Sequence, residues 1–237
     1  MFMLNMLRLS LTIVSCILLL ACGKNKASYT YGTIPDGANA KTFLALDDSY
    51  TIGQGVAIND RFPDQTAALL RSNNINISTP DYIATTGWTT TNLQNAIAAQ
   101  RPALHDVVTL LIGVNDQYLT HDTTGYRNRF TFLLEKCIEL AKGRKTNVFV
   151  LSIPDYSVTP FAAGNDPARI RLEIDWFNAI NRSVTEAYQV AYLDITPSTR
   201  EAQNDPSLIC GDGLHPSGIE YGKWAARLWP MMLPVLR

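Results

Sequence analysis

The stretch KTFLALDDSY, residues 41–50, begins with a short apolar run and ends in acidic and hydroxyl side chains. Four more short apolar runs, rich in β-branched residues, follow it along the chain, and longer segments separate them. Short buried strands that alternate with helices are typical of an α/β domain with a parallel sheet. The five predicted strands cover residues 43–46, part of 75–83, 107–112, 148–153 and 190–195.

Two of the segments between these strands have the apolar spacing of helices. They cover residues 126–141 and 170–188, where apolar side chains recur every three or four positions. A last helix is expected to start near Ser217, to pack Trp224 and Leu228 onto the sheet, and to be interrupted by Pro230. Because crossovers between parallel strands are right-handed, helices cover both faces of the sheet. The prediction is therefore a three-layer α/β/α sandwich around a five-stranded parallel sheet.

The beginning of the chain has the features of an export signal. Arg8 precedes a largely apolar run over residues 9–20, which is short for a membrane span and typical of a secretory signal. The run ends in LLAC, residues 19–22, and resembles the lipobox at which bacterial lipoproteins are cleaved and acylated on cysteine. We therefore expect a lipoprotein signal peptide over 1–21, a flexible tether over 22–41 that starts at a lipidated Cys22, and one folded domain over 42–237.

The residue after the cysteine indicates where such a lipoprotein would reside. Gly23 resembles the outer-membrane type, so we expect a lipid anchor in the bacterial cell envelope, at the outer membrane. An ordinary cleaved signal peptide and a freely secreted protein are the alternative.

Charge and cysteine content limit the classes of partner. A chain of 237 residues with 46% hydrophobic residues can bury one core, and its formal net charge of -1 gives no broad field for nucleic acid. If the signal is removed and Cys22 is acylated, Cys137 and Cys210 remain in an oxidising compartment, where a disulfide is possible. Cys137 falls on the apolar face of a predicted helix, which favours a buried thiol. The sequence does not predict the oligomeric state.

Two segments far apart in the chain carry the side chains of nucleophilic catalysis. Ser49 follows the first strand at a strand-to-helix turn, where serine and aspartate also serve as ordinary helix caps. The segment CGDGLHP, residues 210–216, places Asp212 three residues before His215. A serine nucleophile needs a neutral imidazole as base, and a carboxylate fixes the tautomer of that imidazole. A metal site is the alternative for Asp212 and His215, but the sequence shows no cluster of further ligands.

Two other segments offer hydrogen-bond donors after predicted strands. Gly87 lies in TTGWTT, residues 85–90, and its backbone amide has no side chain to block approach. Asn115 lies in GVND, residues 113–116, and offers a side-chain amide. Together with the Ser49 amide, these donors would form an oxyanion hole, although each motif alone is more often a turn.

Ser49, Gly87, Asn115 and His215 together resemble the SGNH, or GDSL-like, serine hydrolases, which carry these four residue types in this chain order. The resemblance spans residues 43–229 and includes Asp212, and it identifies 42–237 as an SGNH hydrolase domain with a flavodoxin-like five-stranded sheet. It implies a serine esterase that forms an acyl-enzyme and uses no cofactor and no metal. The family includes lipases, thioesterases, carbohydrate acetyl-esterases and acyltransferases, so the resemblance leaves open whether the ester is on a carbohydrate or a lipid.

The chain departs from the family at Asp47, where a glycine usually precedes the aspartate and the serine. A side chain at this position forbids conformations that glycine allows, and its charge would raise the pKa of His215 if the two were close. Asp47 therefore motivates one rival hypothesis, a catalytically weakened lipoprotein that binds carbohydrate. A flavodoxin-like cofactor protein is the other, since Ser49 and Gly53 lie where a flavin phosphate would bind.

The remaining candidates carry weaker hypotheses. His105 precedes the third strand, at the wrong end of the sheet, and is expected to be structural. His121 follows Asn115 by a short loop, where a solvated histidine is favoured over a pocket residue. Asp155 and Tyr156 follow the fourth strand, where substrate contact and a simple turn are equally plausible.

Overall fold

The computed structural model describes residues 39–237. The predicted signal peptide, Cys22 and the tether up to residue 38 lie outside the described residues. Lys41, which the sequence assigns to the tether, forms a parallel β-bridge with Ile77. The folded domain therefore begins just before its predicted start. Within the described residues, no helix combines the length and the apolar character needed to span a membrane.

The sheet has five parallel strands in the order β2-β1-β3-β4-β5. This confirms the predicted α/β fold. The strands are β1 (Phe43–Asp47), β2 (Asp81–Ala84), β3 (Val107–Leu110), β4 (Val148–Leu151) and β5 (Ala191–Leu193). In β1, β3 and β4 every residue is buried, as expected for central strands covered on both faces. Edge strand β2 is half-exposed, and Pro80 separates it from the bridge at Ile77.

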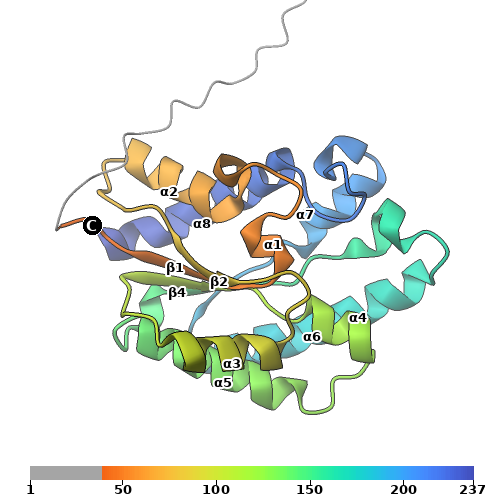
Figure 1. Cartoon of the computed structure of the whole chain (residues 1–237), viewed down its shortest axis with the longest axis horizontal. Helices are drawn as coiled ribbons and strands as arrows, with labels where there is room; N and C mark the ends of the chain where they lie inside the picture. The colour runs from red at the N-terminus through yellow and green to blue at the C-terminus, as the bar shows by residue number, and fades with distance from the viewer. Residues whose placement is uncertain (1–38) are drawn as a thin grey trace, which may run out of the picture. The chain divides into compact units, whose positions relative to one another are not determined.

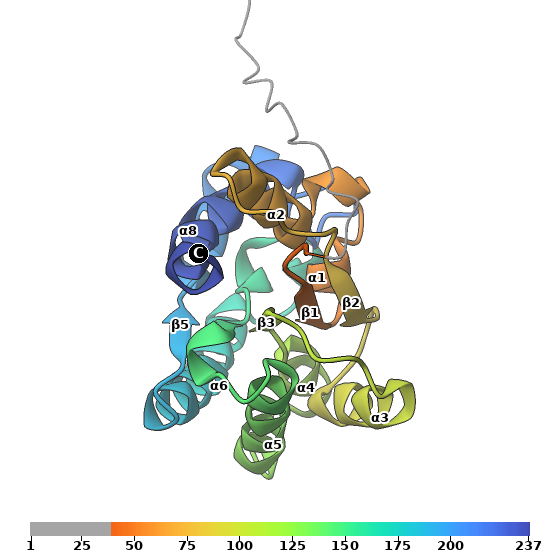
Figure 2. The ribbon, with the colours of Figure 1, turned by 90° about the vertical axis from the view of Figure 1, so that its left-hand side faces the viewer.

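Helices cover both faces of the sheet (Figures 1 and 2). On one face, α2 (Phe62–Ser72) packs against α8 (Gly218–Leu236). On the other, α5 (Tyr126–Leu140) lies between α3 (Thr90–Gln100) and α6 (Pro167–Ala187) and contacts both. Three shorter helices, α1 (Ser49–Ile52), α4 (Val114–Thr120) and α7 (Thr196–Arg200), follow strands β1, β3 and β5 directly. Short 3-10 turns at 58–60, 145–147, 156–158, 160–162, 201–203 and 206–208 complete the connections.

Local sequence signals explain where the long helices begin. Thr89 and Asn92 form a capping box at the start of α3. Asp166 caps α6, whose first residue is Pro167, and Ser217 caps α8 by accepting from the amide of Glu220. These caps satisfy amide groups that have no partner within the helix.

The prediction that Pro230 interrupts the last helix is wrong. Helix α8 continues through Pro230 to Leu236, although a proline inside a helix costs about 3 kcal/mol. Trp224, Leu228, Met232 and Leu236 recur every fourth residue and are all buried. Each buried side chain of this kind contributes about 1.5 to 3 kcal/mol, so burial beyond the proline offsets the lost hydrogen bond.

The topology brings the segments that carry the candidate catalytic residues to the carboxyl ends of the strands. In parallel strands all carboxyl ends lie on the same side, and β1 and β3 are neighbours whose onward connections lead to opposite faces. The loops that follow β1, β2 and β3 contain Ser49, Gly87 and Asn115 respectively. The candidate active site therefore lies at the carboxyl ends of these strands.

Candidate active site

Ser49 is the first residue of α1 and follows β1 with only Asp48 between them. The Asp48 carboxylate caps this short helix by accepting from the Tyr50 amide at 3.0 Å. Helix α1 ends at Gly53, whose φ of 64° is in the left-handed region that glycine tolerates. The turn holds Ser49 largely buried, with its hydroxyl directed at the C-terminal loop.

His215 lies within hydrogen-bond distance of both partners that the sequence predicts. Its Nε2 is 2.9 Å from the Ser49 Oγ, and its Nδ1 is 2.6 Å from the Asp212 Oδ2. A neutral His215 that donates from Nδ1 to Asp212 accepts the Ser49 proton at Nε2, as a general base requires. A bridge between Ile209 and Pro216 closes the loop that carries Asp212 and His215.

Hydrogen bonds hold the Asp212 carboxylate in its charged form. Partial burial would raise the pKa of Asp212, but donors from the chain outweigh it and hold this pKa well below its ordinary value. The donors are the His215 and Leu214 amides, each 2.9 Å from Oδ1, the Cys210 thiol at 3.1 Å and the His215 ring. The carboxylate is therefore ionised at neutral pH and stabilises an imidazolium at His215.

Asn115 lies in the first turn of α4 and lines the pocket beside Ser49. Its Nδ2 donates to the Asp48 Oδ2 at 2.9 Å and to the Trp88 carbonyl oxygen at 3.0 Å. Both amide hydrogens are therefore engaged in the free protein. The same two bonds connect the loop after β3 to the loops that follow β1 and β2.

Gly87 is exposed in a turn with a φ of 80°, and it does not line the Ser49 pocket. Its neighbouring segment is nevertheless fixed to α4. Asp116 accepts from the Thr90 amide at 2.8 Å and from the Thr90 hydroxyl at 2.6 Å, and Arg129 pairs with it at 3.3 Å. The Gly87 loop and the Asn115 turn thus form one hydrogen-bonded unit.

Asp47 fits the site without backbone strain. It closes strand β1, is fully buried, and is absent from the residues with positive φ. Its Oδ2 accepts from the Thr51 hydroxyl at 2.6 Å, while Oδ1 has no partner. Burial, reinforced by the neighbouring charge of Asp48, raises the pKa of Asp47 well above its usual range, which favours the neutral carboxyl.

Asp48 is buried beside Asp47 and behaves differently. Burial raises the pKa of Asp48 to about 7, although hydrogen bonds from the Tyr50 amide and from Asn115 act in the opposite direction. Asp48 is the member of the pair that holds Asn115, through its Oδ2.

The pocket at Ser49 has a volume of about 80 Å³. Aromatic rings dominate its walls. Tyr50 packs against the His215 ring with centroids 5.0 Å apart, and Tyr118, Tyr156 and Phe161 form a cluster with centroid distances of 5.8 to 6.2 Å. The prediction for Tyr156 left substrate contact and a turn equally open, and the structure places this ring in the pocket wall.

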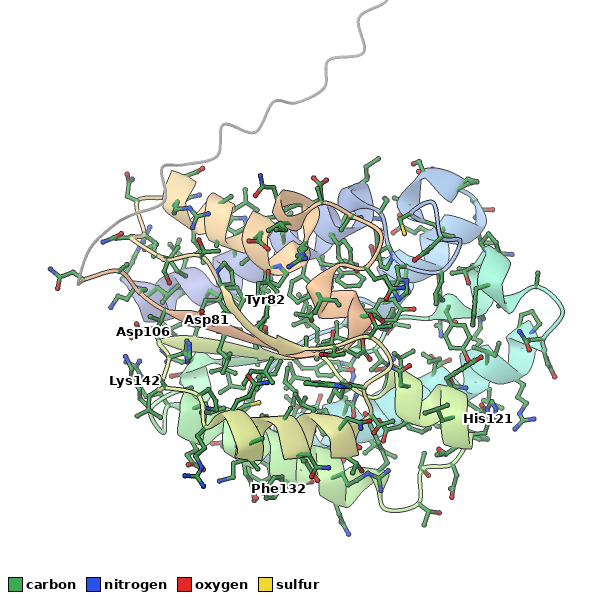
Figure 3. The ribbon with its side chains drawn as sticks, in the orientation of Figure 1. Asp81, Tyr82, Asp106, His121, Phe132 and Lys142 are labelled. Atoms are coloured by element: carbon green, nitrogen blue, oxygen red, sulfur yellow. The ribbon has the colours of Figure 1, made fainter. Side chains whose placement is uncertain are left out.

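The other two histidines make structural contacts. His105 is buried and bonds Asp81 at 2.9 Å, and His121 bonds the buried Glu173 at 2.8 Å. Figure 3 shows Asp81 and His121 at opposite ends of the domain. Cys137 and Cys210 are both free thiols, and Cys137 is fully buried. Among residues 39–237, no group of three or more metal-binding side chains is placed to hold an ion.

Asp116 is the residue whose role the sequence did not reveal. An aspartate in the first turn of a helix is an ordinary stabilising feature, so the motif GVND gives no sign that it binds a loop from another strand. Its separation from Thr90 by 26 residues makes the contact visible only in the fold.

Comparisons with known proteins agree with this geometry. The family model described as the GDSL-like lipase/acylhydrolase family matches residues 48–221. The crystal structure of TesA is 18% identical with a TM-score of 0.61, and the match covers 83% of this chain and all of that one. The crystal structure of a lipase/acylhydrolase from Enterococcus faecalis is 18% identical with a TM-score of 0.61, and the match covers 83% of this chain and 97% of that one. The crystal structure of an acetylxylan esterase from Geobacillus stearothermophilus is 19% identical with a TM-score of 0.60, and the match covers 81% of this chain and 94% of that one. A search of the curated proteins finds no match. At these identities, the structural likeness supports the fold alone.

Proposed function

Since this chain belongs to the GDSL-like lipase/acylhydrolase family and is an ester hydrolase, we propose that it cleaves carboxylic esters through a Ser49-His215-Asp212 triad and an acyl-enzyme. The observation that carries the proposal is the unbroken series of hydrogen bonds from Ser49 through His215 to Asp212 at the carboxyl edge of the sheet.

In the first step, the Ser49 Oγ attacks the ester carbonyl carbon while its proton moves to the His215 Nε2. Asp212 stabilises the imidazolium that results, because it is ionised and bonded to Nδ1. The tetrahedral intermediate then collapses, the bond to the alcohol oxygen breaks, and His215 returns the proton to the leaving alcohol. Ser49 is left acylated.

In the second step, water replaces the alcohol and attacks the acyl carbon. His215 accepts a proton from the water and then donates it to the Ser49 oxygen as the acid departs. The site thus returns to its starting state with no cofactor required.

The proposed oxyanion donors are the amide of Ser49 and the side chain of Asn115. The amide of Gly87, which does not line the pocket in the free protein, would join them only if its loop moved toward Ser49. In the free protein, Asn115 donates to Asp48 and to the Trp88 carbonyl. To bind an oxyanion, it must give up one of these bonds, and the bond to the neutral Trp88 carbonyl is the weaker one. Asp48 would then keep Asn115 oriented while the freed hydrogen turns to the substrate.

The contacts of Asp47 favour a working hydrolase over a catalytically weakened binding protein. Its side chain bonds Thr51 rather than any member of the triad, and the Ser49-His215 bond is formed beside it. The proposal therefore retains full ester hydrolysis.

Turnover of nitrophenyl acetate by the full-length protein in detergent tests this function. Ser49→Ala should lose at least about a thousandfold in kcat, since loss of the nucleophile removes the covalent path. Measuring the released acid distinguishes hydrolysis from acyl transfer, which would move the acyl group to an added alcohol instead. Wild-type turnover that Ser49→Ala retains would refute the triad.

We also propose that the enzyme is a lipoprotein of the bacterial cell envelope, anchored through Cys22 at the outer membrane. The sequence LLAC at residues 19–22 supports this proposal. Incorporation of labelled palmitate in cells should occur in the wild type and disappear in Cys22→Ala. Equal labelling of both would contradict an anchor at this cysteine.

A further inference from the structure

The size of the Ser49 pocket restricts what can bind there. Its volume of about 80 Å³ is far below the roughly 300 to 1,000 Å³ typical of sites for drug-sized ligands. The pocket is therefore better matched to a short chain than to a long one.

Tyr156 forms part of the wall of this pocket. It follows β4 in the turn at 156–158, is 4% exposed, and donates from its hydroxyl to the Gln117 Oε1 at 3.0 Å. Its ring also contacts Tyr118 and Phe161. A ring held by a hydrogen bond and two aromatic neighbours does not move aside readily for a longer ligand.

A second, smaller void lies on the other side of Tyr156. It has a volume of about 20 Å³ and a largely apolar lining that includes Ala202 and Leu208. Tyr50, Tyr156 and Leu214 line both the void and the Ser49 pocket. These three side chains therefore form the wall that separates the two spaces.

We propose that the enzyme prefers esters of short acyl groups, such as acetate and butyrate, over esters of long ones, and that Tyr156 sets this limit. The inference rests on the proposed function, because it assigns the acyl chain to the pocket beside the acylated Ser49. The acyl group stays bound to Ser49 through both steps, so we assign it to the pocket that Tyr156 lines. The alcohol must leave, and it lies at the open rim, where Tyr118 and Phe161 are 46% and 42% exposed.

Removing the Tyr156 ring should join the two spaces and admit a longer chain. In Tyr156→Ala, the void lined by Leu208 becomes continuous with the Ser49 pocket, and the volume of the lost ring is added. The limit on acyl length should then move from butyrate toward octanoate. Leu214→Ala opens the same wall from the other side without removing the bond to Gln117.

The experiment is a series of nitrophenyl esters from acetate to decanoate, with kcat/KM measured for the full-length protein. In the wild type, kcat/KM should fall by at least about tenfold between butyrate and octanoate. Tyr156→Ala or Leu214→Ala should raise the octanoate-to-acetate ratio by about tenfold or more. Tyr156→Phe keeps the ring and should keep the wild-type cutoff. Phe132→Ala, an exposed residue on α5, should leave every rate unchanged.

Three results would overturn the inference while leaving the triad intact. One is a wild-type enzyme that hydrolyses decanoate as well as acetate in a Ser49-dependent manner. Another is an unchanged cutoff in both Tyr156→Ala and Leu214→Ala when both variants are folded by circular dichroism. The third is a fall in kcat/KM with increasing length of the alcohol in a series of alkyl acetates, since the pocket would then hold the leaving alcohol and not the acyl group. Absence of turnover of every ester would instead overturn the proposed function.

Discussion

Replacing Asp47 with asparagine separates the shape of this side chain from its proton. The buried Asp47 carboxyl bonds Thr51 through one oxygen, and its pKa is raised, largely by burial. An asparagine has nearly the same shape and can accept the same bond, but it takes up no proton. The two proteins should therefore differ in how their stability depends on pH.

The sign and size of that difference follow from proton binding. Because the pKa of Asp47 is raised in the folded protein, the folded state holds a proton that the unfolded state releases above its ordinary pKa near 3.8. The wild type therefore loses stability as pH rises, by about 1.4 kcal/mol per pH unit for one full proton. From about pH 5 upward, the free energy of unfolding of the wild type should therefore fall relative to that of Asp47→Asn, until the pH passes the raised pKa of the folded protein.

Urea unfolding of both proteins at several pH values within this range measures the difference. Asp48 titrates in both proteins and is coupled to Asp47, so Asp48→Asn and the double variant complete the comparison. Esterase activity should change little in Asp47→Asn, because Asp47 bonds Thr51 and no member of the triad. Parallel stability curves would refute the raised pKa of Asp47, and a large gain in activity would indicate that Asp47 impairs the triad.

Three further substitutions test the rest of the site. Asn115→Ala should lower kcat by on the order of a hundredfold or more, as loss of an oxyanion donor does, in the nitrophenyl acetate assay. Asp116→Ala should lower both the melting temperature and kcat, because it removes two bonds from Thr90, each worth about 1.5 to 3 kcal/mol; a variant with unchanged kcat would show that the Gly87 loop needs no such support. Gly113→Ala should destabilise the protein by about 3 kcal/mol or more in urea unfolding, since φ is 128° and the added carbon would lie 2.0 Å from the Tyr126 hydroxyl; wild-type stability would contradict this steric argument.

The strands and the order of the catalytic residues were predictable because their signals are local. Apolar runs such as residues 148–151 are buried on both faces, and burial of that kind leaves a continuous hydrophobic pattern. Asp212 and His215 are three residues apart, so one loop holds both, and their pairing follows from the sequence alone.

Other features depend on packing that local signals do not encode. Pro230 is a helix breaker by itself, and only the burial of Met232 and Leu236 explains why α8 continues. The raised pKa of Asp47 depends on full burial, which a single position in the sequence does not reveal. The position of Tyr156 between two voids likewise follows from how the turn after β4 packs against the catalytic loop.

The central claim is that His215 and Asp212 activate Ser49 as a nucleophile. Labelling the full-length protein with a fluorophosphonate probe and locating the adduct by mass spectrometry tests it most directly, because the probe reacts only with an activated serine. The account predicts one adduct, on Ser49, that is lost in Ser49→Ala and strongly reduced in His215→Ala. An unlabelled wild type, or an adduct on Ser49 that forms equally fast in His215→Ala, would contradict it.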